Sequence, residues 1–90
     1  MADGEGGHEQ PQEVVWLHRE GLSLVRAWRE HLGVSREELG RRLGSSPAAV
    51  AQFEARHARP RAAMLKKIAN ALGLENWELL REPPQSGAER

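Results

Sequence analysis

The chain has 90 residues, of which 39% are hydrophobic and 29% are charged, and its formal net charge is zero. This length bounds it to one domain, and the absence of cysteine excludes a disulfide framework and a thiolate metal site. No apolar run approaches membrane-spanning length, and the acidic, polar residues 1–5 do not resemble a secretory signal. We therefore expect a cytoplasmic protein with no membrane partner.

The charges are unevenly distributed along the chain. Residues 1–20 hold five acidic residues and one basic residue, whereas residues 55–67 hold five basic residues and none that is acidic. Such a stretch suits a surface that faces phosphates, although a solvated polar loop gives the same pattern. Because polar residues, Gly and Pro dominate both ends, we expect a disordered leader (1–13), a domain (14–82) and a disordered tail (83–90).

Between these ends the apolar residues recur at helical spacing and never alternate, which predicts an all-α, compact bundle of about five short helices. A short leading helix starts near residue 14 and ends near Gly21. The next helix begins after the N-cap Ser23 and closes at Gly33. Its apolar residues are Leu24, Val25, Trp28 and Leu32.

Paired caps delimit the two following helices. Ser35 and Glu38 form a capping box, in which the serine side chain accepts from the Glu38 N–H and the glutamate reaches back. That helix ends at Gly44, a residue suited to the left-handed conformation of a C-cap. One residue later, Ser46 is the next N-cap, and Pro47 takes the first helical position, where its missing N–H has no effect. Such a short turn is typical of a helix-turn-helix unit, although a plain bundle also contains packed helix pairs.

The rest of the domain follows the same logic. Gly40 lies one turn before Gly44 and is predicted to let the next helix cross closely. That next helix is anchored by Val50 and Phe53. A loop ends at Pro60, and a further helix runs to a glycine cap. The apolar residues of that helix and of the last turn are Met64 or Leu65, Ile68, Leu72, Trp77 and Leu80.

Several short sequence motifs occur in this chain in the order in which a known family has them. They include Val25-Arg26-x-Trp28-Arg29, Glu38-Leu39-Gly40-x-x-Leu43-Gly44-x-Ser46, Val50-x-Gln52-Phe53-Glu54 and Leu65-x-x-Ile68-Ala69-x-Ala71-Leu72-Gly73-Leu74. Residues 24–80 thereby resemble the lambda-repressor-like, or XRE-type, family of helix-turn-helix regulators. The resemblance implies a five-helix bundle whose second and third helices form a unit that binds double-stranded DNA. Residues 25–30 also resemble antitoxins of toxin–antitoxin pairs that repress their own promoter, which implies a toxin partner.

The resemblance assigns the DNA contacts. Those to bases lie on the recognition helix, about residues 46–55, in the major groove, and those to phosphates flank it. In this sequence the positions are Arg36, Ser46, Pro47, Ala48, Gln52, Arg56, His57, Arg59 and Arg61. The family usually has Gly where Arg56 stands, so we expect a reshaped loop. Among alanines, only Gln52 can form a paired hydrogen bond with adenine, so selectivity is modest or depends on DNA shape.

Other residues have two interpretations. The family joins the positions of Arg29 and Glu54 by a salt bridge, and two separate surface charges are the alternative. Trp28 and Trp77 fit core packing better than base stacking, while Trp16 fits the core or a partner contact. The four histidines lack metal-ligand spacing, and no nucleophile–base arrangement is present, so we expect no metal, no cofactor and no enzyme.

Two functions remain open at this stage. The first is a transcriptional repressor that binds DNA as a homodimer, with the last turn (77–80) or residues 14–17 as the dimer surface. The second is a protein-interaction module that keeps the fold with weak or no DNA readout. The alanine-rich recognition helix and the zero net charge favour the second, whereas Gln52 and the Arg59-Pro60-Arg61 cluster favour the first.

Overall fold

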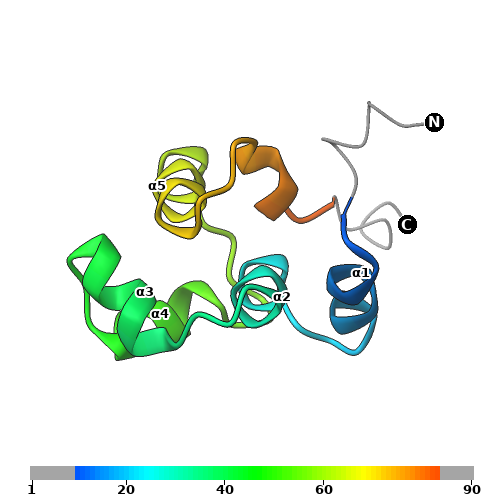
Figure 1. Ribbon diagram of the computed structural model, residues 1–90, viewed down its shortest axis with the longest axis horizontal. Helices are drawn as coiled ribbons and strands as arrows, with labels where there is room; N and C mark the ends of the chain where they lie inside the picture. Colours follow the sequence, from blue (N-terminus) through cyan, green and yellow to red (C-terminus); the bar gives the residue numbers. More distant parts are fainter. Residues whose placement is uncertain (1–9, 84–90) are drawn as a thin grey trace.

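The computed structural model describes residues 10–83, and this part of the chain is helical without a strand, which confirms the all-α prediction. The helices are α1 (Gln12–Arg19), α2 (Leu24–His31), α3 (Arg36–Leu43), α4 (Pro47–Phe53), α5 (Ala62–Leu72) and the 3₁₀ helix η2 (Trp77–Leu80). In Figure 1, α2 lies in the centre, α1 lies at one end, and α3 and α4 lie together at the other. Within residues 10–83, no helix is long and apolar enough to cross a membrane.

Serine caps start the three central helices, as the sequence predicts. The side chains of Ser23, Ser35 and Ser46 accept hydrogen bonds from the third backbone N–H after each, at 3.0–3.1 Å. Each of these bonds satisfies an N–H that has no partner inside its helix. At the opposite ends, Gly44 (φ 69°) and Gly73 (φ 79°) take the left-handed conformation.

One half of the predicted capping box is wrong. The Ser35 side chain accepts from the Glu38 N–H as expected, but the Glu38 carboxylate does not reach back to the start of the helix. It accepts hydrogen bonds from Arg41 and, at 3.0 Å, from Nε of Arg42 instead. The two arginines lie three and four residues further along, where helical side chains meet, and a charged donor is a stronger partner than a backbone N–H.

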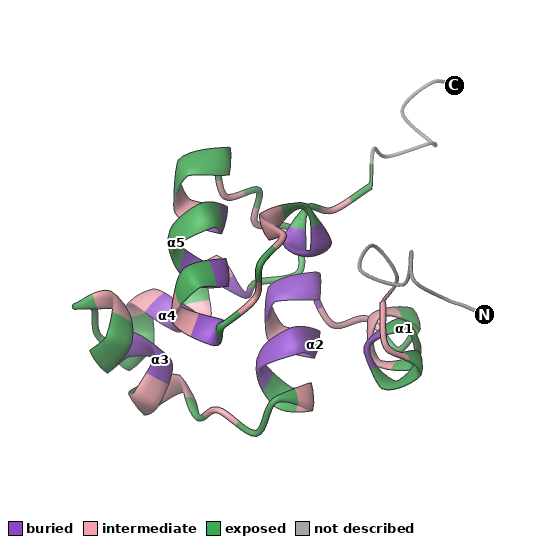
Figure 2. Cartoon of the chain, turned by 45° about the horizontal axis from the view of Figure 1, so that its top comes forward, coloured by how far each residue is buried: buried purple, intermediate pink, exposed green. Residues whose placement is uncertain are grey.

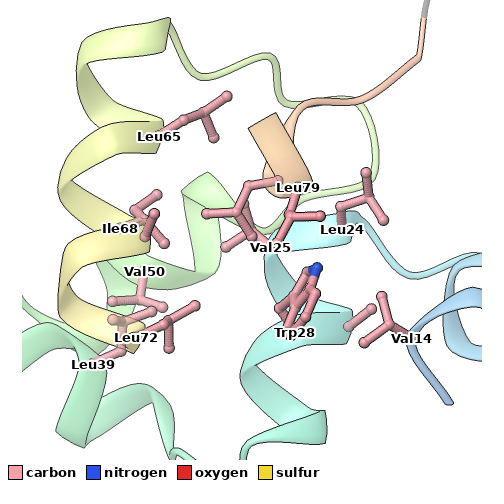
Figure 3. Close-up of a cluster of buried hydrophobic side chains, with 13 residues drawn as sticks. Val14, Leu24, Val25, Trp28, Leu39, Val50, Leu65, Ile68, Leu72 and Leu79 are labelled. Atoms are coloured by element: carbon pink, nitrogen blue, oxygen red, sulfur yellow. The ribbon is translucent and has the colours of Figure 1, made fainter. Parts of the chain in front are cut away.

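The core forms where α2 meets the other helices. Figure 2 shows that α2 is buried along much of its length, while α5 exposes its outer face. In the close-up of Figure 3, Val14 lies beside Trp28, while Val50 and Ile68 lie further toward α3 and α5. Leu32, which we predicted on the apolar side of its helix, is 40% exposed, since α2 ends at His31 and the chain turns toward Gly33.

The two ends of the described chain meet beside α2. The Gln10 side chain accepts from the Trp28 indole N–H at 2.8 Å and donates to the Leu79 carbonyl at 3.0 Å. At the other end, a Glu82 carboxylate oxygen accepts from the Leu24 backbone N–H at 2.7 Å. The ordered unit therefore starts earlier than the predicted residue 14, because Gln10 is held by these bonds and α1 already begins at Gln12. The rest of the terminal segments for which we predicted disorder, residues 1–9 and 84–90, lies outside the described residues.

Candidate nucleic-acid interface

A sharp turn at Gly44 sets the angle between α3 and α4. The Gly44 N–H donates to the Arg41 carbonyl at 3.2 Å, and the Ser45 N–H donates to the Gly40 carbonyl at 2.7 Å. These bonds satisfy the last carbonyls of α3 and need the positive φ of Gly44. Residues with a Cβ adopt that conformation at a cost, so glycine at this position permits the turn without steric strain.

The close approach of the turn to α3 depends on a second glycine. A Cβ on Gly40 would lie 2.7 Å from the Ser45 carbonyl oxygen and 3.2 Å from the Ser46 carbonyl carbon. Both atoms belong to the backbone and cannot swing away. The absence of a side chain at Gly40 thus lets the turn and the start of α4 lie against α3, as the sequence predicts.

The helix α4 has one buried and one exposed side. Val50 is fully buried and Phe53 packs against the core, whereas Pro47, Ala48 and Gln52 are exposed. Ala48 and Gln52 are four residues apart and therefore lie on the same side of the helix. The exposed side is nearly smooth, with one long polar side chain, Gln52, which makes no hydrogen bond to another residue within 10–83.

A buried ion cluster ties this unit to α2. The Glu54 side chain is 1% exposed and accepts hydrogen bonds from Nε of Arg29 and, at 3.2 Å, from its Nη2. The Arg29 side chain, 8% exposed, also donates to the Val34 carbonyl at 2.7 Å. These contacts confirm the predicted pair, and they fix the end of α4 to α2 and to the segment that leads into α3.

The cluster has a third member that the sequence did not indicate. Nε of Arg36 donates to Oε1 of Glu54 at 3.1 Å, so this arginine supports the position of α4. The family resemblance predicts only a phosphate contact for Arg36. Its side chain remains 40% exposed, and within 10–83 its Nη nitrogens have no hydrogen-bond partner. A phosphate contact through these terminal nitrogens is compatible with the Glu54 bond.

The remaining predicted contacts follow α4 in the chain. Arg56, His57, Arg59 and Arg61 are all exposed. No described residue other than glycine has a positive φ, so the loop accommodates Arg56 without the strain that a family glycine position would impose. Arg59 and Arg61 border a shallow hollow of about 500 Å³ beside Gln52. Lys67 lies on the same hollow; it belongs to the basic run 55–67 but is not among the predicted contacts.

The tryptophans and histidines do not extend this surface. Trp28 is buried and Trp77 packs against the core with Lys66 Nζ 5.6 Å from its ring centre, so neither is free to stack on bases. His18 Nδ1 donates to the Leu22 carbonyl at 2.9 Å, and His31 lies 2.7 Å from a Glu13 carboxylate oxygen. In the described part of the chain, no group of three or more His, Asp or Glu residues could hold a metal ion.

On α3, hydrogen bonds from Arg42 and then Arg41 hold the pKa of the Glu38 carboxyl below its usual value, since the carboxylate alone can accept them both. Glu38 lies on the solvent side of the unit, where it pairs with both arginines and offsets one of their two positive charges. The basic character of the surface is left to the loop after α4 and to α5.

The fold and this geometry define a small helical domain built around a helix-turn-helix unit. A family model described as helix-turn-helix matches residues 25–75, more than half of the chain. The chain therefore belongs to the lambda-repressor-like, XRE-type family of helix-turn-helix DNA-binding regulators. No curated protein and no solved structure matched the chain.

Proposed function

We propose that this protein is a sequence-specific transcriptional regulator that inserts α4 into the major groove of double-stranded DNA. The observation that carries the proposal is the exposed side of α4, held by the Gly44 turn and by the Glu54 cluster. A rigidly held helix with a smooth surface can lie deep in a groove, and Gln52 can then form a bidentate pair with adenine. Ala48, one turn earlier, contacts a thymine methyl group.

Phosphate contacts are assigned on both sides of α4. Ser46 and Pro47 lie at the start of the helix, and Arg36 lies at its other end, where it contacts Glu54. Arg56, His57, Arg59 and Arg61 follow the helix. Arginine suits this role because its planar guanidinium pairs with phosphate in a bidentate manner. The basic side chains compensate locally for the zero net charge of the whole chain.

A homodimer on a two-fold DNA site completes this proposal, because one such small unit makes few phosphate contacts. The surface around η2 no longer supports the interface, since Leu79 and Leu80 are buried in the core. The segment at α1 still supports it, with Val15 38% and Trp16 58% exposed. An antitoxin role with a toxin partner belongs to the same proposal and rests on the resemblance of residues 25–30.

The test compares base reading with backbone binding. Gln52→Ala should lose roughly 1–3 kcal/mol on a selected site and little on scrambled DNA. Arg61→Ala should weaken binding to both DNAs and lower the salt slope by about one. Asn70→Ala, an exposed polar residue on α5, is the matched control and should change neither. An unchanged ratio of selected to scrambled affinity in Gln52→Ala would contradict major-groove reading by α4.

A protein-interaction module is the second candidate. The observation in its favour is that the exposed side of α4 consists mainly of Pro47, Ala48 and Gln52, with few groups able to recognise a base. A wild-type protein that binds neither selected nor scrambled DNA at low salt would establish this alternative over the first.

A further inference from the structure

A second hollow, of about 410 Å³, lies where the turn between α1 and α2 meets the loop after α4 and the segment after η2. Its basic lining consists of His18 and Arg19 from the end of α1 and of Arg56, His57 and Arg59 from the loop. Arg19 lies outside the matched segment 25–75. The volume is that of about a dozen water molecules, so it accommodates one phosphate group with room to spare.

The turn approaches the loop through a glycine. Gly21 has φ +111°, and a Cβ there would lie 4.0 Å from Nη1 of Arg56. The Arg56 guanidinium therefore lies next to the bare backbone of this turn, two residues from Arg19. The fold brings together basic side chains that are 37 residues apart in sequence.

These cations lack anionic partners within residues 10–83, as Arg61 and Arg81 also do, but unlike those two they lie together around this hollow. Arg26, Arg29 and Arg42 each bind a carboxylate. By contrast, the side chains of Arg19 and Arg56 make no hydrogen bond or ion pair within residues 10–83, and the Arg59 side chain donates only to the Ala58 carbonyl.

The one carboxylate that lines the hollow is already engaged. Glu82 accepts from the Leu24 N–H at 2.7 Å through Oε2, and its Oε1 lies 3.5 Å from Nε2 of His18. Glu82 offsets at most one of the three guanidinium charges around the hollow, so a net positive charge remains that an anionic phosphate group would offset. Guanidinium groups bind phosphate oxygens in a bidentate manner and suit this ligand better than ammonium groups do.

We propose that this hollow is a phosphate-binding site that α1 completes through Arg19, acting with Arg56 and Arg59. Arg59 also lines the hollow beside Gln52, so the site continues the basic surface that flanks the recognition helix. The phosphate belongs either to the DNA backbone or to a free phosphorylated ligand. In the first case, the inference rests on the proposed DNA-binding function and extends its footprint to α1.

The experiment uses the full chain, Arg19→Gln and the control Arg81→Gln. Both arginines are exposed, and Arg81 does not line the hollow. One arm measures duplex affinity against salt concentration, and the other titrates inorganic pyrophosphate by calorimetry without DNA. Circular dichroism and thermal melting verify that both variants fold like the wild type.

A backbone phosphate predicts that Arg19→Gln lowers the salt slope by about one while Arg81→Gln leaves it unchanged. A free ligand predicts that pyrophosphate binds the wild type and that Arg19→Gln weakens this binding at least five-fold. The inference is overturned if Arg19→Gln matches the wild type in both arms, or if Arg81→Gln has the same effect as Arg19→Gln.

The two proposals can fail separately. Duplex binding with selectivity that depends on Gln52, together with a neutral Arg19→Gln in both arms, removes the phosphate site alone. If the wild type does not bind duplex DNA, the proposed DNA-binding function is refuted. The pyrophosphate titration then tests the phosphate site on its own.

Discussion

Removal of the Glu54 carboxylate should be among the most damaging single changes in this domain. In Glu54→Ala, the Arg29 side chain, 8% exposed, loses two hydrogen bonds and its buried counter-ion. Breaking such a pair costs about 3–5 kcal/mol. Arg29 keeps the Val34 carbonyl at 2.7 Å and has the Glu30 carboxylate 3.8 Å away, so we expect about 3 kcal/mol, the lower end of that range.

This loss is large for so small a domain. At roughly 4–8 °C per kcal/mol for a domain of 60–100 residues, the melting temperature should fall by about 12–24 °C. Urea denaturation followed by tryptophan fluorescence measures the change, because the buried Trp28 adjoins Arg29 in α2. Glu37→Ala removes an exposed carboxylate from the same unit and should stay within about 0.5 kcal/mol of the wild type.

A double variant tests whether the uncompensated charge is the cause. Replacing both partners, as Arg29→Met with Glu54→Leu, removes the charges together and should recover much of the stability lost in Glu54→Ala. If Glu54→Ala and Glu37→Ala have equal unfolding free energies, the cluster does not hold the domain together. If the double variant is less stable than Glu54→Ala, the contacts rather than the stranded cation account for the loss.

Three further predictions concern α3. Gly40→Ala should destabilise the domain by about 1–3 kcal/mol in urea melts despite alanine's better helix propensity, because its Cβ would lie 2.7 Å from the Ser45 carbonyl oxygen; a more stable variant would contradict this close approach. Gly44→Val should lower the melting temperature because a β-branched residue is strained at φ 69°, and an unchanged value would mean that the turn is not rigid. The folded-state pKa of Glu38 is lowered by hydrogen bonds from Arg42 and Arg41, so its stabilising contribution is complete above the unfolded pKa and is lost as pH falls through the folded value. Glu38→Gln should therefore be less stable than the wild type at neutral pH, with the difference shrinking on acidification; a difference independent of pH would exclude the ionised carboxylate as its source.

Local backbone chemistry explains why much of the helix-turn-helix unit is predictable. Ser46, Pro47 and Gly44 each satisfy a requirement of a helix end that depends on neighbouring residues only. The pattern of Val50 and Phe53 likewise indicates the buried side of α4 without any knowledge of the fold. The exposed position of Gln52 is predictable for the same reason. When one side of a helix packs against the core, the residues on the opposite side face solvent.

Features that depend on competition or on distant contacts could not be predicted in this way. Whether Glu38 binds the helix start or Arg42 depends on side-chain conformations that the spacing leaves open. The burial of Leu80 and the role of Gln10 depend on how the chain ends pack. An apolar residue in a terminal turn, such as Leu80, can pack in the core or in an interface equally well. A glutamine in a polar leader, such as Gln10, has no sequence pattern that indicates a structural contact.

The bond between Gln10 and the Leu79 carbonyl bears on where this domain begins and ends as an autonomous folding unit. It joins residues 69 positions apart, so loop-closure entropy places its formation after the packing of the intervening helices. A fragment cut at residues 25–75 would lack Val14 and Leu80, both almost completely buried, and would open a void beside Trp28. It would also lack both Leu24, the first residue of α2, and Glu82, which accepts from the Leu24 N–H. Cooperative folding therefore requires about twenty residues more than the segment by which the family is recognised.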